Sequence, residues 1–156
     1  MVGAKDLQAR LAKRAGVAVS LGSLACAEAL GKFPKVRSIG ILTPYQPIGD
    51  RQVAAFFEEN GWTVGAVHSL KRPSEVLISH ATTADLRDGL RALAAKGVDA
   101  IVQAGTDLAM ADLTGEAERW LGIPVIAINV ATYWVALRAN GIADRIDGFG
   151  ALLAEH

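Results

Sequence analysis

The chain has 156 residues, in which 16 lysines and arginines balance 16 aspartates and glutamates, and 51% of the residues are hydrophobic. This length suits one domain with a real core, and the lack of a basic stripe or acidic tail argues against nucleic acid and anionic membranes as partners. No apolar run reaches the roughly 18 positions that a membrane span needs, and residues 1–14 are charged, unlike a signal peptide. One cysteine and three scattered histidines offer neither an internal disulfide nor a metal-ligand spacing. The composition therefore predicts a cytoplasmic globular protein without a metal site.

Short runs of β-branched residues alternate with longer amphipathic stretches along the chain. Glycines, prolines and capping residues set the expected boundaries of these segments. Asp50 is the expected N-cap of the third helix, and Thr82 or Thr83 that of the fourth. In chain order, the predicted elements are a helix over 4–15, a strand over 17–20, a helix over 22–30, a strand over 38–42, a helix over 50–60, a strand over 63–67, a helix over 83–96, a strand over 100–103, a helix over 113–121, a strand over 125–128 and a helix over 131–139.

This alternation predicts an α/β fold, with a parallel sheet that helices cover on both faces. Ligands of such sheets bind beyond the carboxyl ends of the strands. Two turns lie there: Thr43-Pro44-Tyr45, and Ala104-Gly105-Thr106-Asp107. Both offer hydroxyls and backbone N–H groups near a helix start, which can hold a carboxylate or phosphate. The alternative is that Pro44 and Gly105 only shape turns and that Thr106 caps a helix.

Several segments of the chain carry a resemblance to a known family. They are Ile41-Leu42-Thr43-Pro44-Tyr45 with Asp50, Ala104-Gly105-Thr106-Asp107-Leu108, residues 118–125, residues 129–138, Gly141-Ile142 and Gly148-Phe149-Gly150. Together they resemble the maleate cis-trans isomerase and arylmalonate decarboxylase family of the aspartate/glutamate racemase superfamily. The similarity covers nearly the whole chain in the correct order.

The resemblance implies two similar α/β lobes that hold a small dicarboxylate between them. In the family two cysteines, one per lobe, act without a cofactor, and the decarboxylases keep only one of them. By this resemblance Tyr45 matches a substrate-contacting tyrosine, and Thr106 matches the hydroxyl beside the second-lobe cysteine. Gly105 stands in the place of that cysteine, while Asp50 and Asp107 stand where the family usually has asparagine.

The resemblance also implies a division of the chain. Residues 37–128 are expected to form one complete lobe, while residues 1–33 and 129–156 are expected to belong to the other. The first-lobe cysteine is then expected upstream of Met1.

The departures from the family pattern bear on the chemistry. A glycine cannot transfer a proton or attack an alkene, and two carboxylates in place of amides would repel an anion by several kcal/mol in a partly dry cleft. The aspartates are therefore protonated, or bind a cation or water, or the original substrate is no longer recognised. Cys26 lies mid-helix among small apolar residues, which favours a structural role.

Two functional hypotheses follow from the resemblance. The first is a protein that binds a small carboxylic acid through Tyr45, Gly105, Thr106, Asp107 and Asp50, and that isomerises, racemises or decarboxylates it without a cofactor. A homo-oligomer or a partner chain would complete the second lobe. The alternative is a non-catalytic binding or structural descendant, or a fragment of a longer two-lobe enzyme.

Overall fold

Residues 2–156 are described by the computed structural model, and in this part of the chain one parallel sheet has the strand order β2-β1-β3-β4. The strands are β1 (Ser38–Thr43), β2 (Thr63–Ser69), β3 (Ala100–Gln103) and β4 (Val125–Ala127). The helices are α1 (Val2–Ala15), α2 (Gly22–Leu30), α3 (Pro47–Glu59), α4 (Thr83–Ala94), α5 (Ala111–Leu121), α6 (Ile128–Ala139) and α7 (Ala151–Glu155), and the 3-10 helix η1 (Val76–His80) precedes α4.

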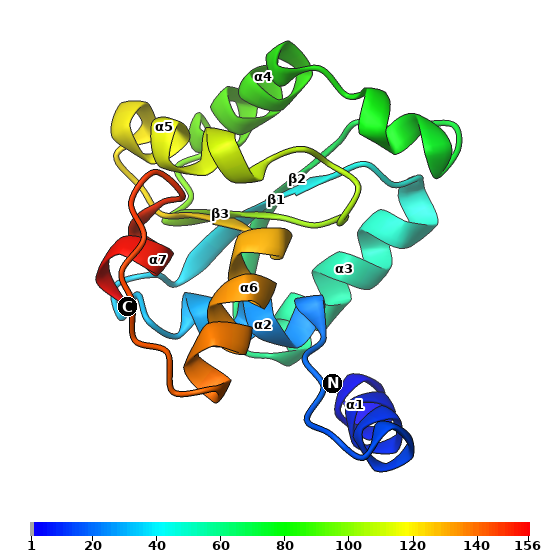
Figure 1. Cartoon of the computed structure of the whole chain (residues 1–156). Helices are drawn as coiled ribbons and strands as arrows, with labels where there is room; N and C mark the ends of the chain where they lie inside the picture. Colours follow the sequence, from blue (N-terminus) through cyan, green and yellow to red (C-terminus); the bar gives the residue numbers. More distant parts are fainter. Residues whose placement is uncertain (1) are drawn as a thin grey trace.

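The sheet is covered by helices on both faces (Figure 1). Helices α4 and α5 pack on one face, and α2, α3 and α6 pack on the other. The predicted α/β class and parallel sheet are therefore confirmed. Helix α1 stands apart from this body and contacts α2. The assignment of residues 1–33 and 129–156 to another lobe stays a prediction.

The core lies around the two central strands. Ile39, Ile41, Ile101 and Val102 are completely buried, as their β-branched runs predict for strands with helices on both faces. On the face of α2 and α6, the largest buried side chain is Trp134, which is 1% exposed. Helix α6 packs against α2, which is rich in alanine, and such small side chains let two helices approach closely.

Some predicted boundaries are wrong. Residues 17–20 form no strand and pair with no strand in residues 2–156. Asp50 is not an N-cap, because α3 begins earlier, with Pro47 in its first turn and Gln46 as the cap. Proline is favoured there because its fixed φ suits a helix start and its missing N–H is not needed. Helix α6 begins at Ile128, directly after β4, although the sequence predicts its start at 131.

Among residues 2–156, no helix combines the length and apolar character that crossing a membrane requires.

Candidate functional site

The two turns selected from the sequence lie at the same edge of the sheet. Strands β1 and β3 are hydrogen-bonded neighbours, and Leu42 is in register with Gln103 at their carboxyl ends. The turn after β3 therefore meets the turn after β1. A Cβ built on Gly105 would lie 2.6 Å from Cγ of Pro44 and 3.7 Å from the phenol oxygen of Tyr45. The structure thus brings Tyr45 and Gly105 together.

The turn over residues 105–107 is held in place by side chains that bond its carbonyls, while its N–H groups stay free. The Gln103 side chain donates from Nε2 to the carbonyls of Ala104 and Gly105, at 2.8 and 2.7 Å. The Asn129 side chain donates to the carbonyl of Thr106 at 2.8 Å. The N–H groups of residues 105, 106 and 107 have no acceptor within the described chain. Successive free N–H groups of this kind form an anion-binding concavity.

The start of α6 adds positive potential beside this turn. Asn129 belongs to the first turn of α6, so its bond to Thr106 places the helix N-terminus next to residues 105–107. This terminus has neither a capping side chain nor an acidic residue in its first turn. The partial positive charge of a helix N-terminus therefore favours an anion here.

Tyr45 supplies a neutral hydroxyl to the site. Its side chain is half-buried, and burial raises the pKa of the phenol, with the negative charge of Asp107 adding to the increase. The phenol is therefore protonated at neutral pH and is able to donate a hydrogen bond to a ligand. Its backbone is held in place, because the Ser69 hydroxyl donates to the Tyr45 carbonyl at 2.6 Å.

Asp50 lies apart from the Gly105 turn, on the first turn of α3. Its Oδ1 accepts a hydrogen bond from the hydroxyl of Thr43, and that hydroxyl also accepts from the N–H of Tyr45 at 3.4 Å. Asp50 therefore supports the turn that carries Tyr45. Thr106 and Asp107 are both exposed on the second turn. Their direct contact with a ligand, like that of Asp50, stays a prediction.

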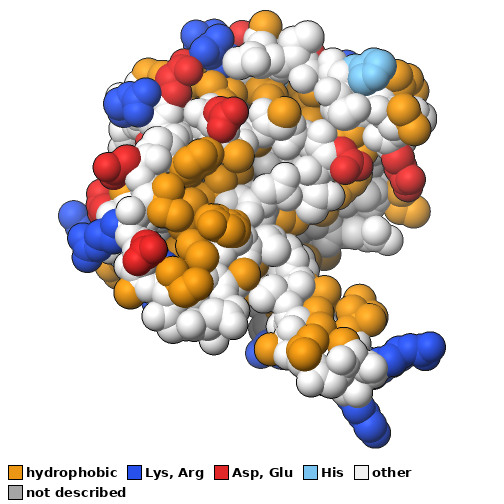
Figure 2. All heavy atoms as spheres, in the orientation of Figure 1, with side chains coloured by type: hydrophobic (Ala, Val, Ile, Leu, Met, Phe, Trp, Pro, Cys, Tyr) orange, Lys and Arg blue, Asp and Glu red, His pale blue; other side chains and the backbone are white. Residues whose placement is uncertain are grey.

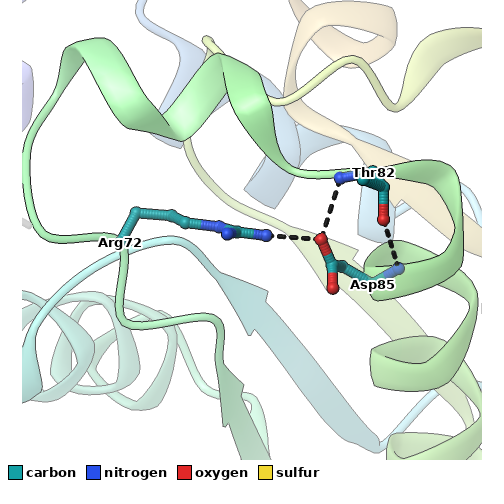
Figure 3. A network of polar contacts seen from close by, with 3 residues as sticks. All are labelled: Arg72, Thr82 and Asp85. Atoms are coloured by element: carbon teal, nitrogen blue, oxygen red, sulfur yellow. Dashed lines mark hydrogen bonds and ion pairs between the residues drawn. The ribbon is translucent and has the colours of Figure 1, made fainter.

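Arg72 links the turn that carries Tyr45 to helix α4. The N–H of Arg72 donates to the Pro44 carbonyl at 2.8 Å. The Arg72 guanidinium contacts the Asp85 carboxylate at 2.5 Å, while Asp85 and Thr82 bond each other's backbone N–H groups in a capping box (Figure 3). This confirms Thr82 as the N-cap. The chain of contacts fixes the Thr43-Pro44-Tyr45 turn against α4.

Asp85 makes the stability of this arrangement depend on pH. Hydrogen bonds from the Thr82 backbone and hydroxyl, and then the one from Arg72, hold the pKa of Asp85 below its ordinary value of 3.8. The stabilisation is therefore present above the unfolded pKa and is lost as the pH falls through the lower folded pKa. We expect Asp85→Asn to lower the unfolding midpoint at pH 6, and this difference to decrease steadily as the pH is lowered below 3.8, measured by thermal unfolding. Asp88→Asn, whose carboxylate is exposed on the same helix, is the matched control.

Cys26 has the properties of a structural residue. Its side chain is 1% exposed, and burial raises the pKa of the thiol to about 12. Such a thiol is not ionised at neutral pH and is a poor nucleophile.

Sequence reasoning missed the residues that secure the second turn. Gln103 is 1% exposed and ends a buried strand, and its Oε1 has no partner among the described residues. A polar residue at the carboxyl end of an apolar strand was the available signal. Asn129 gave no such signal, because its role depends on α6 starting immediately after β4.

Fold and candidate site together give a parallel α/β protein with a turn of free N–H groups at the carboxyl edge of its sheet. The family model described as arylmalonate decarboxylase matches residues 3–153. The chain belongs to the arylmalonate decarboxylase family.

Individual relatives agree with this assignment. Arylmalonate decarboxylase of Bordetella bronchiseptica is 32% identical over 123 residues, which are 77% of this chain and 51% of that protein. Maleate isomerase of Pseudomonas putida is 28% identical over 121 residues, covering 77% of this chain and 48% of the relative. The chain thus spans about half the length of the curated relatives it matches.

Solved structures show the same fold. A crystal structure of arylmalonate decarboxylase superimposes with a TM-score of 0.89 at 26% identity, over 100% of this chain and 69% of the other. The C200A variant of the maleate isomerase Iso from Pseudomonas putida S16, solved with maleate, superimposes with a TM-score of 0.77 at 26% identity, over 88% of this chain and 54% of the other.

Proposed function

We propose that this protein binds a small carboxylic acid at the carboxyl ends of β1 and β3 and transfers a proton at the carbon next to the bound carboxylate, without a cofactor. The observation that carries the proposal is the turn over residues 105–107. Its three N–H groups lack acceptors among the described residues and lie near the neutral Tyr45 phenol and the uncapped start of α6. The names of the relatives support the ligand class, because arylmalonate and maleate are both carboxylic acids.

The chemistry suits these groups. Isomerisation, racemisation and decarboxylation next to a carboxylate all build up negative charge on the carboxylate oxygens as an enediolate. Fixed N–H donors aimed at those oxygens stabilise that charge more than they stabilise the ground state. Within this proposal Tyr45 donates a proton to the carbon, and the resulting phenolate regains a proton from water. Thr106 borders the bound carboxylate, Asp107 contributes its backbone N–H while its side chain is exposed to solvent, and Asp50 acts through Thr43.

The proposal is tested by NMR of the uniformly ¹⁵N-labelled protein. Titration with acetate, phenylacetate, maleate and phenylmalonate is expected to shift the amide signals of residues 105–107. Proton NMR of the ligands in deuterated buffer is expected to show incorporation of deuterium next to the carboxylate. Tyr45→Phe should keep the amide shifts and lower the exchange rate by about 10²-fold or more, the usual contribution of a general acid.

The possible outcomes separate binding from chemistry. If none of the four acids shifts the amides of residues 105–107, carboxylate binding at this turn is wrong. If an acid binds without exchange or turnover, the protein is a non-catalytic binder of that acid. Tyr133→Phe is the matched control, because that phenol is 53% exposed on α6 and lies outside the site.

The exposed apolar surface supports a second element of the proposal, assembly with another copy or a partner chain. On α1, Leu7 and Leu11 are 45% and 39% exposed, and Figure 2 shows apolar side chains on this protruding helix. A further apolar area covers α6 and α7, where Tyr133 and Phe149 line an apolar hollow of about 190 Å³. Contiguous apolar areas of this kind are typical of interaction surfaces. A monomer in light scattering at working concentration would contradict self-assembly.

The cytoplasmic location stays a prediction.

A further inference from the structure

A cavity of about 420 Å³ opens next to the anion-binding turn, and residues of α2, α3, β3 and α6 line it. We call it the α2–α3 cavity. Gly105 and Tyr45 belong to its lining, so it is continuous with the site of the proposed carboxylate. Its volume falls within the usual range for small-molecule pockets, about 300–1,000 Å³.

The lining of the α2–α3 cavity is uncharged. Val53 and Phe56 of α3, Val102 of β3 and Ile128 of α6 supply apolar surface, and no lysine, arginine, histidine, aspartate or glutamate takes part. Cys26 also faces it, and its thiol stays neutral because burial raises the pKa to about 12. A charged group would lose its hydration in this cavity without gaining a partner, so a neutral apolar group is preferred.

The turn that contributes Gly105 to the cavity also carries a negative charge. Asp107 is exposed on the turn that also contains Gly105, and its carboxylate is close enough to Tyr45 to raise the pKa of the phenol. A ligand with a second carboxylate would have to place it either in the uncharged cavity or near Asp107. Both positions are unfavourable for an anion.

Building on the proposed function, we infer that the preferred ligand is a monocarboxylic acid with an apolar substituent. Its carboxylate binds the N–H groups of residues 105–107, and its aromatic or branched aliphatic group occupies the α2–α3 cavity. Asp107 disfavours a dicarboxylate.

Comparison of four acids tests this inference. Phenylacetate is expected to bind about 10- to 100-fold more tightly than acetate, the gain for burying one ring. Phenylacetate is also expected to bind about three- to tenfold more tightly than phenylmalonate, and maleate should show no advantage over acetate. The difference in affinity between phenylacetate and phenylmalonate should become smaller in 0.5 M salt, because salt screens an exposed charge. It should also become smaller in Asp107→Asn, because that variant removes the charge. Amide signals of Val53, Phe56 and Ile128 should shift with phenylacetate and stay unchanged with acetate.

A variant that fills the cavity makes the test specific. Val53→Phe is expected to remove most of the advantage of phenylacetate over acetate while the shifts at residues 105–107 with acetate remain. Ala55→Phe introduces the same ring on the same helix at an exposed position outside the cavity lining, and it should keep the advantage. If Val53→Phe fails to fold, Val53→Ala serves instead. The larger cavity should then favour 1-naphthylacetate over phenylacetate more strongly than the wild type does.

The outcomes distinguish this inference from the proposed function. If acetate shifts residues 105–107 but phenylacetate binds no more tightly, the α2–α3 cavity is not part of the site and the inference is wrong. If phenylmalonate or maleate binds more tightly than phenylacetate, the assigned ligand class is wrong. If no acid binds, the proposed function fails together with the inference. A shift of Val53 and Phe56 by neutral benzyl alcohol alone would then show an apolar site without a carboxylate partner, and would also overturn the inference.

Discussion

Replacement of Gly105 by cysteine is expected to destabilise the protein by about 2–4 kcal/mol instead of creating an active thiol. Gly105 has a φ of +100°, a conformation that a residue with a Cβ rarely adopts. A Cβ at this position would also lie 2.6 and 2.8 Å from the Cγ and Cδ atoms of Pro44. The backbone conformation and the Pro44 ring therefore leave no room for a side chain at position 105, and the missing thiol is not a simple truncation.

Urea unfolding, followed by circular dichroism, measures this effect. Thr106→Cys is the matched control, because it places a thiol on the same turn at a residue without a positive φ. Its stability should stay within about 0.5 kcal/mol of the wild type, as for most exposed substitutions. The double variant Pro44→Ala/Gly105→Cys should be less destabilised than the sum of the two single variants, because the alanine removes the ring atoms that clash. A Gly105→Cys variant as stable as the wild type would contradict the described conformation.

The second large effect is expected for Trp134. Trp134→Ala should cost about 3–5 kcal/mol, since it leaves a cavity between α2, α6 and the sheet. For a chain of this length the loss corresponds to a drop of roughly 6–20 °C in the unfolding temperature. Lys32 also places its ammonium 5.4 Å from the centre of the indole ring, a contact that the variant loses.

The control for this prediction is Trp120→Ala. Trp120 is 38% exposed on α5, although the Arg91 guanidinium lies 5.3 Å from its ring centre, so its removal should cost less than half as much. Differential scanning calorimetry of the two variants gives the comparison directly. Equal losses would show that the packing of α6 on α2 is not the main contribution of Trp134.

Local sequence patterns were sufficient to predict the α/β architecture. The alternation of β-branched runs with amphipathic segments depends only on residues within one element, and it predicted the parallel sheet and most of the helices. The strand predicted over residues 17–20 is absent from the structure. The composition of that segment suits a strand, but no neighbouring strand pairs with it. A strand needs a partner, and a partner is a long-range property.

The candidate site could be predicted in part. The turns after β1 and β3 were identifiable because the ligand edge of a parallel sheet follows from its topology. The partner of Asp50 was not identifiable from its place near a helix start. An N-cap and a residue inside the first turn have similar local sequence signals, and the hydroxyl of Thr43 decided between them.

By itself, the sequence determined the fold class, the edge of the sheet that carries the site, and the absence of a side chain at position 105. Only the tertiary structure decided the backbone conformation and the contacts of that glycine. The contact with Pro44 and the positive φ of Gly105 depend on how two turns meet, although positions 44 and 105 are 61 residues apart in the chain. The α2–α3 cavity likewise depends on the packing of three helices against one strand. The hydrophobic periodicity of a sequence predicts which face of a helix or strand is buried, but it does not predict how closely two buried faces approach each other.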